Sequence, residues 1–429
     1  MVRFLHTADL HLDSPLRGLQ RYEGAPTEQI RSAPRKAFQN LVQLALREQV
    51  QLVVIAGDIY DGDWQDHNTG LFFVRQISQL TNAGVYVIAI NGNHDAARQM
   101  TRTLPLPRNP DGTEIMLSCD SAETRCLENI GVAIHGRSFA DRAEEENLVT
   151  QYPAAEPGLF NIGVLHTSLT GSEGHNTYAP CRPIDLMDKQ YHYWALGHIH
   201  QRGQHHDADD PLAAPIWFSG NIQGRHVRET GPKGCLIVDV DAKFTPRVRF
   251  EPLDVVRWQV AELDVSDLDS IDDIHQWYAD WLDKNLNQAA SRLLAHRINL
   301  FGRSVLHQRL HHDHEALQQG LRARAIDLGR GNAWLETVKL RTKPVVERDK
   351  TELLGPLGCV ERFFESVHTN ETLAEIKTEL AALNQRLPVE LIADPIEPMQ
   401  LDQDQFLAEL LAESEAFLKS QLLMQERQE

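Results

Sequence analysis

Cysteine is scarce in this sequence and forms no metal-binding motif. The chain has five cysteines in 429 residues, and no two of them stand in a CxxC spacing. The odd number argues against a complete disulfide framework, and the spacing argues against a zinc site built from thiolates. We therefore expect the chain to work in a reducing compartment, the cytoplasm, and any metal site to use other ligands.

Long hydrophobic runs are also missing. No stretch of about 18 apolar residues occurs, which excludes a predicted membrane-spanning helix. The first residues, Met1 to Asp9, lack the order of charged, apolar and small residues that marks a signal peptide. We expect neither a membrane anchor nor export.

Positive charge is not in excess. The formal net charge is −19, and residues 345–429 alone carry 7 Lys/Arg against 18 Asp/Glu. This balance argues against binding nucleic acid through a broad basic face. A local basic patch or a metal site that contacts phosphate remains open.

What the sequence does contain, in its first part, is an alternation of apolar strands and helices. Strands are predicted at 2–9, 52–58 and 85–90, with helices at 28–49 and 68–84 between them. This order predicts parallel, buried strands in a layered α/β fold. The later apolar runs have no long helix between them, which predicts a second, partly antiparallel sheet.

The chain is too long for one hydrophobic core, and its pattern of predicted strands and helices changes twice. We expect an α/β domain over 1–252, a small α+β domain over 253–343 and an acidic helical region over 344–429. A His-rich segment, 310–315, shows no apolar pattern that would hold it rigid, so a further metal site there is disfavoured.

Five polar motifs stand at the carboxyl ends of predicted strands. They are Asp9-Leu-His11, Gly57-Asp58, Gly92-Asn93-His94-Asp95, His166, and Gly197-His198-Ile199-His200. Open α/β sheets carry their sites at this edge, so the five can converge. Residues two apart on an extended segment point to the same side, which predicts that Asp9 and His11 share one ion.

Each motif alone has a plain structural explanation. Gly57-Asp58 is usually a turn, and a histidine such as His166 is more often a hydrogen-bonded core residue than a ligand. The run from Asn91 to Asp95 is the strongest single signal, because a turn needs Asn-Gly but not the His-Asp that follows. Together and in this order, the five motifs favour a metal site.

The donor set indicates which ions would fit. Histidine, aspartate and asparagine without cysteine suit manganese, iron or zinc. Seven candidate ligands are too many for one ion and suit two, which is the arrangement used to hydrolyse phosphate esters. Asp58 is placed to bridge them.

These motifs, in the order D-x-H, G-D, G-N-H-D, H and G-H-x-H, resemble those of the calcineurin-like metallophosphoesterase superfamily. Within it, the opening "FLHTADLHL", "GDIYD" and "YWALGHIH" look like SbcD-type DNA repair nucleases. The segment "HTSLTGSEGHNTYAPC" is similar to the YhaO-like branch. The fold implied is a layered β-sheet metallophosphoesterase sandwich followed by an α+β capping domain and a helical C-terminal tail.

The resemblance implies two divalent ions, expected to be Mn²⁺, with Fe, Zn or Mg as alternatives. One would be held by Asp9, His11, Asp58 and His200, and the other by Asp58, Asn93, His166 and His198. His94 would face the scissile phosphate and assist a metal-bridging hydroxide, while Asp95 would orient His94.

The chain also departs from the family pattern. Where several members have a histidine that touches substrate, three residues after the bridging carboxylate, this chain has Asp61. That leaves the balance of exonuclease and endonuclease activity open. His175 and Tyr178, on a Gly-containing segment after His166, could contact substrate or simply belong to a surface loop.

The resemblance further implies partners. The expected helices at 371–386 and 402–425 would dock on an SMC-like ATPase of the SbcC or YhaN type, and a homodimer is possible. The second helix carries an apolar stripe from Phe406 to Leu422. This stripe could equally pack onto the chain's own capping domain.

Three functions remain in view. The first is a two-metal DNA exonuclease of repair, with endonuclease action open, and the alternative is a phosphoesterase for small diesters such as cyclic nucleotides. The motifs do not separate these two, but a capping domain with basic residues such as Arg322 and Arg324 favours the nuclease. The third, a non-catalytic scaffold, is disfavoured because the ligand set is intact.

Overall fold

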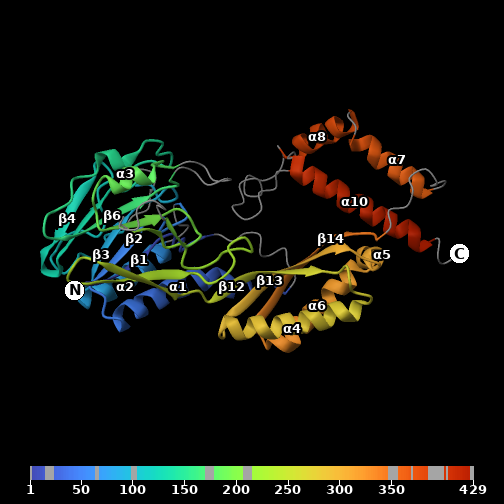
Figure 1. Cartoon of the computed structure of the whole chain (residues 1–429), viewed down its shortest axis with the longest axis horizontal. Coiled ribbons are helices and arrows are strands. Elements are labelled where there is room, and N and C mark those ends of the chain that lie inside the picture. The colour runs from blue at the N-terminus through green and yellow to red at the C-terminus, as the bar shows by residue number, and fades with distance from the viewer. Residues whose placement is uncertain are drawn as a thin grey trace. The chain divides into compact units, whose positions relative to one another are not determined.

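The computed structural model describes residues 2–14, 24–62, 67–97, 104–169, 178–205, 215–345, 356–368, 371–384, 401 and 404–425. The chain divides into two compact units, and the main division falls between Arg257 and Trp258. Figure 1 shows the elements of both units. The expected boundaries at 252 and 343 stay a prediction.

The first sheet contains the apolar runs from the start of the chain. Its strand order is β11-β10-β1-β2-β3. The strands are β1 (Val2–Thr7), β2 (Leu52–Ala56), β3 (Tyr86–Ile90), β10 (Gly234–Val240) and β11 (Pro246–Pro252). β1, β2 and β3 are parallel, and β2 is buried at every position, as expected for a strand covered on both faces.

The second sheet has the order β4-β5-β6-β7-β9-β8. Its strands are β4 (Glu123–Leu127), β5 (Val132–Gly136), β6 (Phe160–His166), β7 (Tyr193–Gly197), β8 (Gly203–His205) and β9 (Ile216–Phe218). The four inner strands are parallel, whereas β4 and β8 are antiparallel to their neighbours. The predicted second sheet therefore exists. The run at 234–240 nevertheless joins the first sheet, antiparallel to β1.

The two sheets pack face to face with helices outside them (Figure 1). Phe4 and Val54 from the first sheet meet Phe160 from the second in one buried cluster. Helices α1 (Thr27–Arg47) and α2 (His67–Asn82) cover the outer face of the first sheet, and α3 (Pro183–Met187) covers that of the second. Two short 3₁₀ turns, Glu128–Ile130 and Leu148–Gln151, complete the layer. The sandwich fold expected from the sequence is confirmed.

The second unit starts with a three-stranded sheet of order β12-β13-β14. Its strands are β12 (Val256–Asp264), β13 (Leu293–Arg303) and β14 (Ala333–Lys343), and its helices are α4 (Ile271–Ala289), α5 (His307–His312) and α6 (His314–Gly329). Ser270 begins α4 through a capping box with Asp273. The expectation of an unanchored His-rich segment is wrong, because the segment is helical and buried Leu310 and Leu317 tie it to the core.

Three tail helices follow, α7 (Pro356–His368), α8 (Glu371–Asn384) and α10 (Asp404–Gln425). Sequence periodicity did not reveal α7. Phe364 of α7 packs against Leu407 and Leu411 of α10. The predicted stripe of α10 is therefore divided, because Phe406, Leu410, Phe417 and Leu418 stay exposed. None of the described helices is long and apolar enough to cross a membrane.

Candidate metal centre

The strand ends bring all seven predicted ligands to one edge of the two sheets. β1, β2 and β3 run in one direction, so the residues that follow them share that edge. The last residue of β6 is His166, and His198 follows β7 directly. The predicted ligands are Asp9, His11, Asp58, Asn93, His166, His198 and His200. The convergence expected from the motifs is what the structure shows, and their role as ligands stays a prediction.

The backbone at these positions is not extended. Asp9, His11, Asp58 and His198 have φ values of 53°, 44°, 52° and 96°. Non-glycine residues rarely adopt this left-handed region, and such strain is typical of functional sites. The idea that Asp9 and His11 align on an extended strand is therefore wrong. They meet because the chain turns after β1, held by the amides of Asp9 and His11, which donate to Gly57 and Asp58.

One group of donors is formed by Asp9, His11 and His200. Their ligand atoms all lie within 4.8 Å of one another. The Nε2 atoms of His11 and His200 are 3.2 Å apart. Two ring nitrogens at this distance compete for one proton, whereas a shared cation would satisfy both lone pairs.

A second group surrounds Asp58. His166 Nε2 lies 3.4 Å from Asp58 Oδ2 and 3.0 Å from Asn93 Oδ1, which also lies 3.2 Å from His198 Nδ1. His11 Nε2 is 3.9 Å from the same Asp58 oxygen. Asp58 therefore stands between the two groups, as a bridging ligand would.

The charges inside the centre are strongly coupled. Burial disfavours ionised Asp58, but its neighbours, His166 first, hold the pKa of its carboxyl below the usual range. Burial also disfavours protonated His166, yet the Asp58 carboxylate raises the pKa of that ring to about 9. Positive charge is thus strongly favoured between these groups, and the donor set fits two divalent ions.

Two glycines permit this close approach. A Cβ on Gly57 would lie 2.4 Å from His166 Nδ1, and one on Gly92 would lie 2.3 Å from Asp58 Oδ1. Gly57 also has a φ of 97°, which favours glycine. The glycine in each of these two motifs therefore serves the site as well as the turn.

His94 differs from most of the predicted ligands in its exposure. Its side chain is 40% exposed, and its Nδ1 lies 2.6 Å from Asp61 Oδ1. Its backbone amide donates to Asp58 Oδ1 at 3.0 Å. Burial opposes protonation of His94, but the hydrogen bond to Asp61 and the negative charges of Asp58 and Asp61 together outweigh it, so the pKa of the ring is raised. His94 is thus a partly exposed ring at the rim of the centre that readily carries a proton.

Asp95 does not have the role expected of it. Its two oxygens accept the backbone amides of Gly92 at 2.7 Å and Ile59 at 2.8 Å, with Tyr60 at 3.4 Å. Its side chain thereby ties the β3 end to the β2 end. Asp61 is the carboxylate that contacts the His94 ring in the described part of the chain, so the prediction that Asp95 orients His94 is wrong. Burial raises the pKa of Asp95 to about 7.

Three residues around the centre had no assigned role. In the sequence, Asp61 is only a departure from the family pattern. Arg225 and Glu229, buried beside His200, carried no motif signal. Arg225 lies 3.4 Å from Asp61 and 3.3 Å from Glu229.

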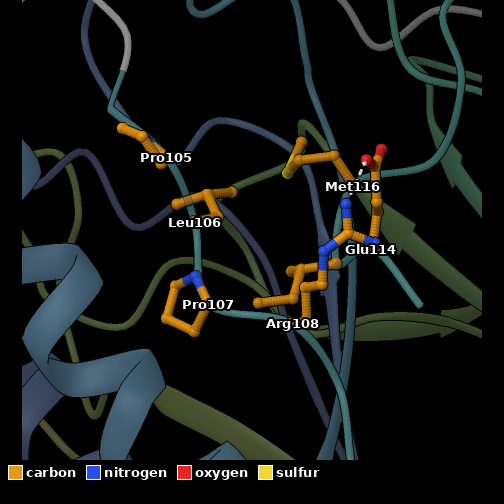
Figure 2. Close-up of a pocket in the computed structure, with 7 residues that line it drawn as sticks. Pro105, Leu106, Pro107, Arg108, Glu114 and Met116 are labelled. Carbon is orange, nitrogen blue, oxygen red and sulfur yellow. Dashed lines mark hydrogen bonds and ion pairs between the residues drawn. The ribbon is translucent and has the colours of Figure 1, made fainter. Parts of the chain in front are cut away.

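The proposed substrate contacts are only partly visible. The Tyr178 ring centroid lies 5.2 Å from that of His198, so this side chain borders the centre. His175 lies outside the described residues. A separate cavity of about 360 Å³, shown in Figure 2, contains none of the predicted site residues. It is lined by Pro105, Leu106, Pro107, Arg108, Glu114, Ile115 and Met116, with Arg108 and Glu114 side by side.

Comparison with known proteins identifies two families that match this chain. The family described as calcineurin-like phosphoesterase matches residues 2–202, and the one described as the middle domain of metallophosphoesterase YhaO matches 258–343. The uncharacterized metallophosphoesterase YhaO of Bacillus subtilis is 32% identical over 66% of this chain and 67% of its own length. The DNA double-strand break repair protein Mre11 of Sulfolobus acidocaldarius is 23% identical, over 64% and 70%.

A third relative is a component of the nuclease SbcCD of Staphylococcus epidermidis. It is 24% identical, over 62% of this chain and 74% of its own length. The motif order, the sandwich fold and the similarity over two thirds of the Bacillus relative agree with one another. The chain belongs to the calcineurin-like metallophosphoesterase family.

Proposed function

We propose that this chain is a two-metal phosphodiesterase that cleaves DNA as an exonuclease in repair. One observation carries the proposal. Seven nitrogen and oxygen donors meet at one sheet edge, and the half-exposed side chain of His94, which is held by Asp61, lies against them. With ions bound, such an arrangement would present a phosphodiester to both metals and to a proton donor at once.

The chain's own residues would divide the work as follows. The groups around Asp9 and His200 and around Asn93 and His166 would hold the ions. When bound, the ions, expected to be Mn²⁺, would supply Lewis-acid stabilisation of the phosphate. Asp61 fixes Nδ1 of His94, which leaves Nε2 to protonate the leaving oxygen or to stabilise charge on the phosphate.

Two observations support DNA as the substrate. The named relatives include a DNA double-strand break repair protein and a component of a nuclease. On β14, Lys339, Arg341 and Lys343 alternate along one side of the strand, and in the described part of the chain none of them forms an ion pair. Arg322 does not belong to this surface, because it donates to the backbone of Leu335 and Glu336.

A partner would dock on the tail. We propose an SMC-like ATPase of the SbcC or YhaN type, and the exposed Phe406, Leu410 and Phe417 of α10 support an apolar contact. The face of α10 with Leu407 and Leu411 is not free for a partner, because it packs on α7. The helix α10 also contacts α5. A homodimer stays open. The five free cysteines support work in the cytoplasm.

The substrate is tested with the purified full chain and Mn²⁺. Labelled duplex and single-stranded DNA are offered beside bis-p-nitrophenyl phosphate and 2′,3′-cyclic AMP. We expect release of nucleotides from DNA ends, with weaker hydrolysis of the small esters. Hydrolysis of the small esters with untouched DNA would establish the alternative, a phosphoesterase for small diesters. No hydrolysis of any ester would refute the catalytic proposal.

A further inference from the structure

The segment that follows β9 brings two charged side chains into the core beside His200. Arg225 is 8% exposed and Glu229 is 7% exposed, so both are nearly removed from water. Burying a carboxylate and a guanidinium costs free energy unless both are paired and hydrogen-bonded. The contacts of Arg225 and Glu229 therefore indicate which side chains this segment positions.

Glu229 holds the ring of His200. Its Oε1 lies 2.6 Å from His200 Nδ1. Its Oε2 accepts the amide of Arg225 at 2.7 Å and the Nδ2 of Asn221 at 2.9 Å. With Nδ1 occupied by the carboxylate, the lone pair of His200 is on Nε2, the atom that faces His11. A carboxylate in this position fixes the tautomer and orientation of a histidine ligand.

Arg225 links Glu229 to the other side of the centre. One guanidinium nitrogen lies 3.3 Å from Glu229 Oε1, and the other lies 3.4 Å from Asp61 Oδ2. The second oxygen of Asp61 lies 3.2 Å from His11 Nδ1 and 2.6 Å from His94 Nδ1. A single buried chain of contacts thus runs from His200 to His11 and His94.

The charge balance explains why a guanidinium is needed here. The side chains of Asp61 and Glu229 are 6% and 7% exposed. Both contact histidines that also lie beside Asp9 or Asp58, so four carboxylates lie in one region. Without a cation between them, Asp61 and Glu229 would repel each other and the ligands. Arg225 offers a planar fork that reaches both, which a lysine would not do.

The segment has other anchors. Gln223 donates to the Val256 carbonyl at 2.6 Å and accepts the Val255 amide at 2.8 Å. Lys233 donates to the His200 carbonyl at 2.8 Å. Because these contacts hold the backbone without Glu229, a change at its carboxylate should alter the ring of His200 more than the fold.

We infer that Glu229 and Arg225 are positioning residues that set the ligand nitrogens of His200 and His11 and couple them to His94. Glu229 acts on metal affinity, since it touches the ring of one candidate ligand. Arg225 acts on His200 through Glu229, and it acts on His11 and His94 through Asp61. The part that concerns His94 rests on the proposed function, whereas the part that concerns metal affinity does not.

Glu229→Gln tests the first part. A carboxamide has one oxygen, so it would place an N–H against either His200 or the donors of Arg225 and Asn221. Calorimetric titration of the metal-free full chain with Mn²⁺ should show a dissociation constant roughly 10–100-fold higher for one of the two ions. Glu251→Gln, a half-exposed carboxylate paired with Arg249 on β11, should leave both constants unchanged.

Arg225→Lys tests the second part. At saturating Mn²⁺, kcat for bis-p-nitrophenyl phosphate should recover in Glu229→Gln but stay low in Arg225→Lys, because Asp61 then holds His94 poorly. Recovery in both variants would overturn the coupling. Wild-type Mn²⁺ affinity in Glu229→Gln would overturn the positioning role.

A purely structural role predicts a different result, namely a lower metal-free Tm with unchanged Mn²⁺ constants, and this too would refute the inference. If Glu229→Gln does not fold by circular dichroism, Glu229→Asp is read instead. It keeps the charge but is one methylene short of His200, so it should show the same loss of affinity. If the wild type binds Mn²⁺ yet cleaves no ester, the proposed function and the part of the inference that concerns His94 both fail. The part that concerns metal affinity is then decided by the Mn²⁺ titration of Glu229→Gln.

Discussion

At the scale of single residues, exposure separates the groups that would hold ions from the group that would meet the substrate. Asp9, His11 and Asp58 are almost completely buried, whereas the side chain of His94 is 40% exposed. Buried polar donors at one point are costly unless a cation or a hydrogen bond satisfies them. A proton donor must reach the substrate and must not be bound to an ion. The partly exposed His94 ring, which is not among the predicted ligands, meets both conditions.

Replacement of His94 tests this separation. His94→Ala should lower kcat on the order of 10²–10⁴-fold, the usual contribution of a general acid or base. Calorimetry should show unchanged Mn²⁺ affinity, because His94 is not among the predicted ligands. His67→Ala, at the exposed start of α2, is the control and should keep full activity. Full activity in His94→Ala would exclude the proposed mechanism.

A residue far from the centre gives a pH prediction. His296 is buried in the second unit against the Tyr278 hydroxyl at 2.7 Å. Burial lowers the pKa of its ring from 6.5 to about 4. The unfolded chain therefore binds a proton between these values while the folded chain does not, so stability present above pH 6.5 is lost as the pH falls toward 4.

The size of this loss is up to about 3 kcal/mol of the free energy of unfolding. Urea unfolding of the full chain followed by tryptophan fluorescence measures it, since the Trp281 ring lies 5.1 Å from that of His296. His296→Gln should lose correspondingly less stability over the same pH range. Parallel losses in both proteins would contradict the prediction.

At the scale of elements, the decisive features are the turns that leave the strands. Gly57-Asp58 follows β2 and Gly92-Asn93 lies in the turn after β3, and a side chain at either glycine would enter the centre. Parallel strands deliver the turns to one edge, and left-handed residues then point the donors inward. The strands fix where the site is, and the turns fix its geometry.

Gly92→Ala tests the role of the turn. The new Cβ would lie 2.3 Å from Asp58 Oδ1, so the carboxylate must move. We expect a cost of about 1–3 kcal/mol in unfolding free energy and weaker Mn²⁺ binding by calorimetry. Gly203→Ala on β8 has open space around its Cβ and should change neither. If both variants have the same unfolding free energy and the same Mn²⁺ affinity, Gly92 has no special role in the geometry of the centre.

At the scale of the whole molecule, the first unit gathers four buried carboxylates, and Arg225 is paired with only two of them, Asp61 and Glu229. Mn²⁺ should therefore stabilise the native chain by about 2.7 kcal/mol at 100 times its dissociation constant. Thermal unfolding should show a rise of roughly 5–10 °C in Tm, reversed by EDTA. Asp58→Asn removes the bridging carboxylate and should abolish most of the rise. A rise of the same size in that variant would contradict a two-ion centre.

Prediction from sequence succeeded where local pattern and strand direction were enough. The apolar runs gave β1, β2 and β3, and their polar ends had to share one edge. Prediction from sequence failed where a strand or side chain contacts a residue far away in the sequence. The pairing of β10 with β1 joins residues more than 200 positions apart, and the contact of Asp61 with His94 depends on side-chain orientation rather than on spacing.

The sequence by itself determined the fold class, the edge that carries the site and the identity of the candidate ligands, because strand periodicity and motif order are local properties. Only the tertiary structure decided how these side chains are held. It placed Asp61 rather than Asp95 against His94 and put Glu229 and Arg225 behind His200. The physical reason is that buried charges choose partners by distance in space, and separation along the chain does not reveal that distance.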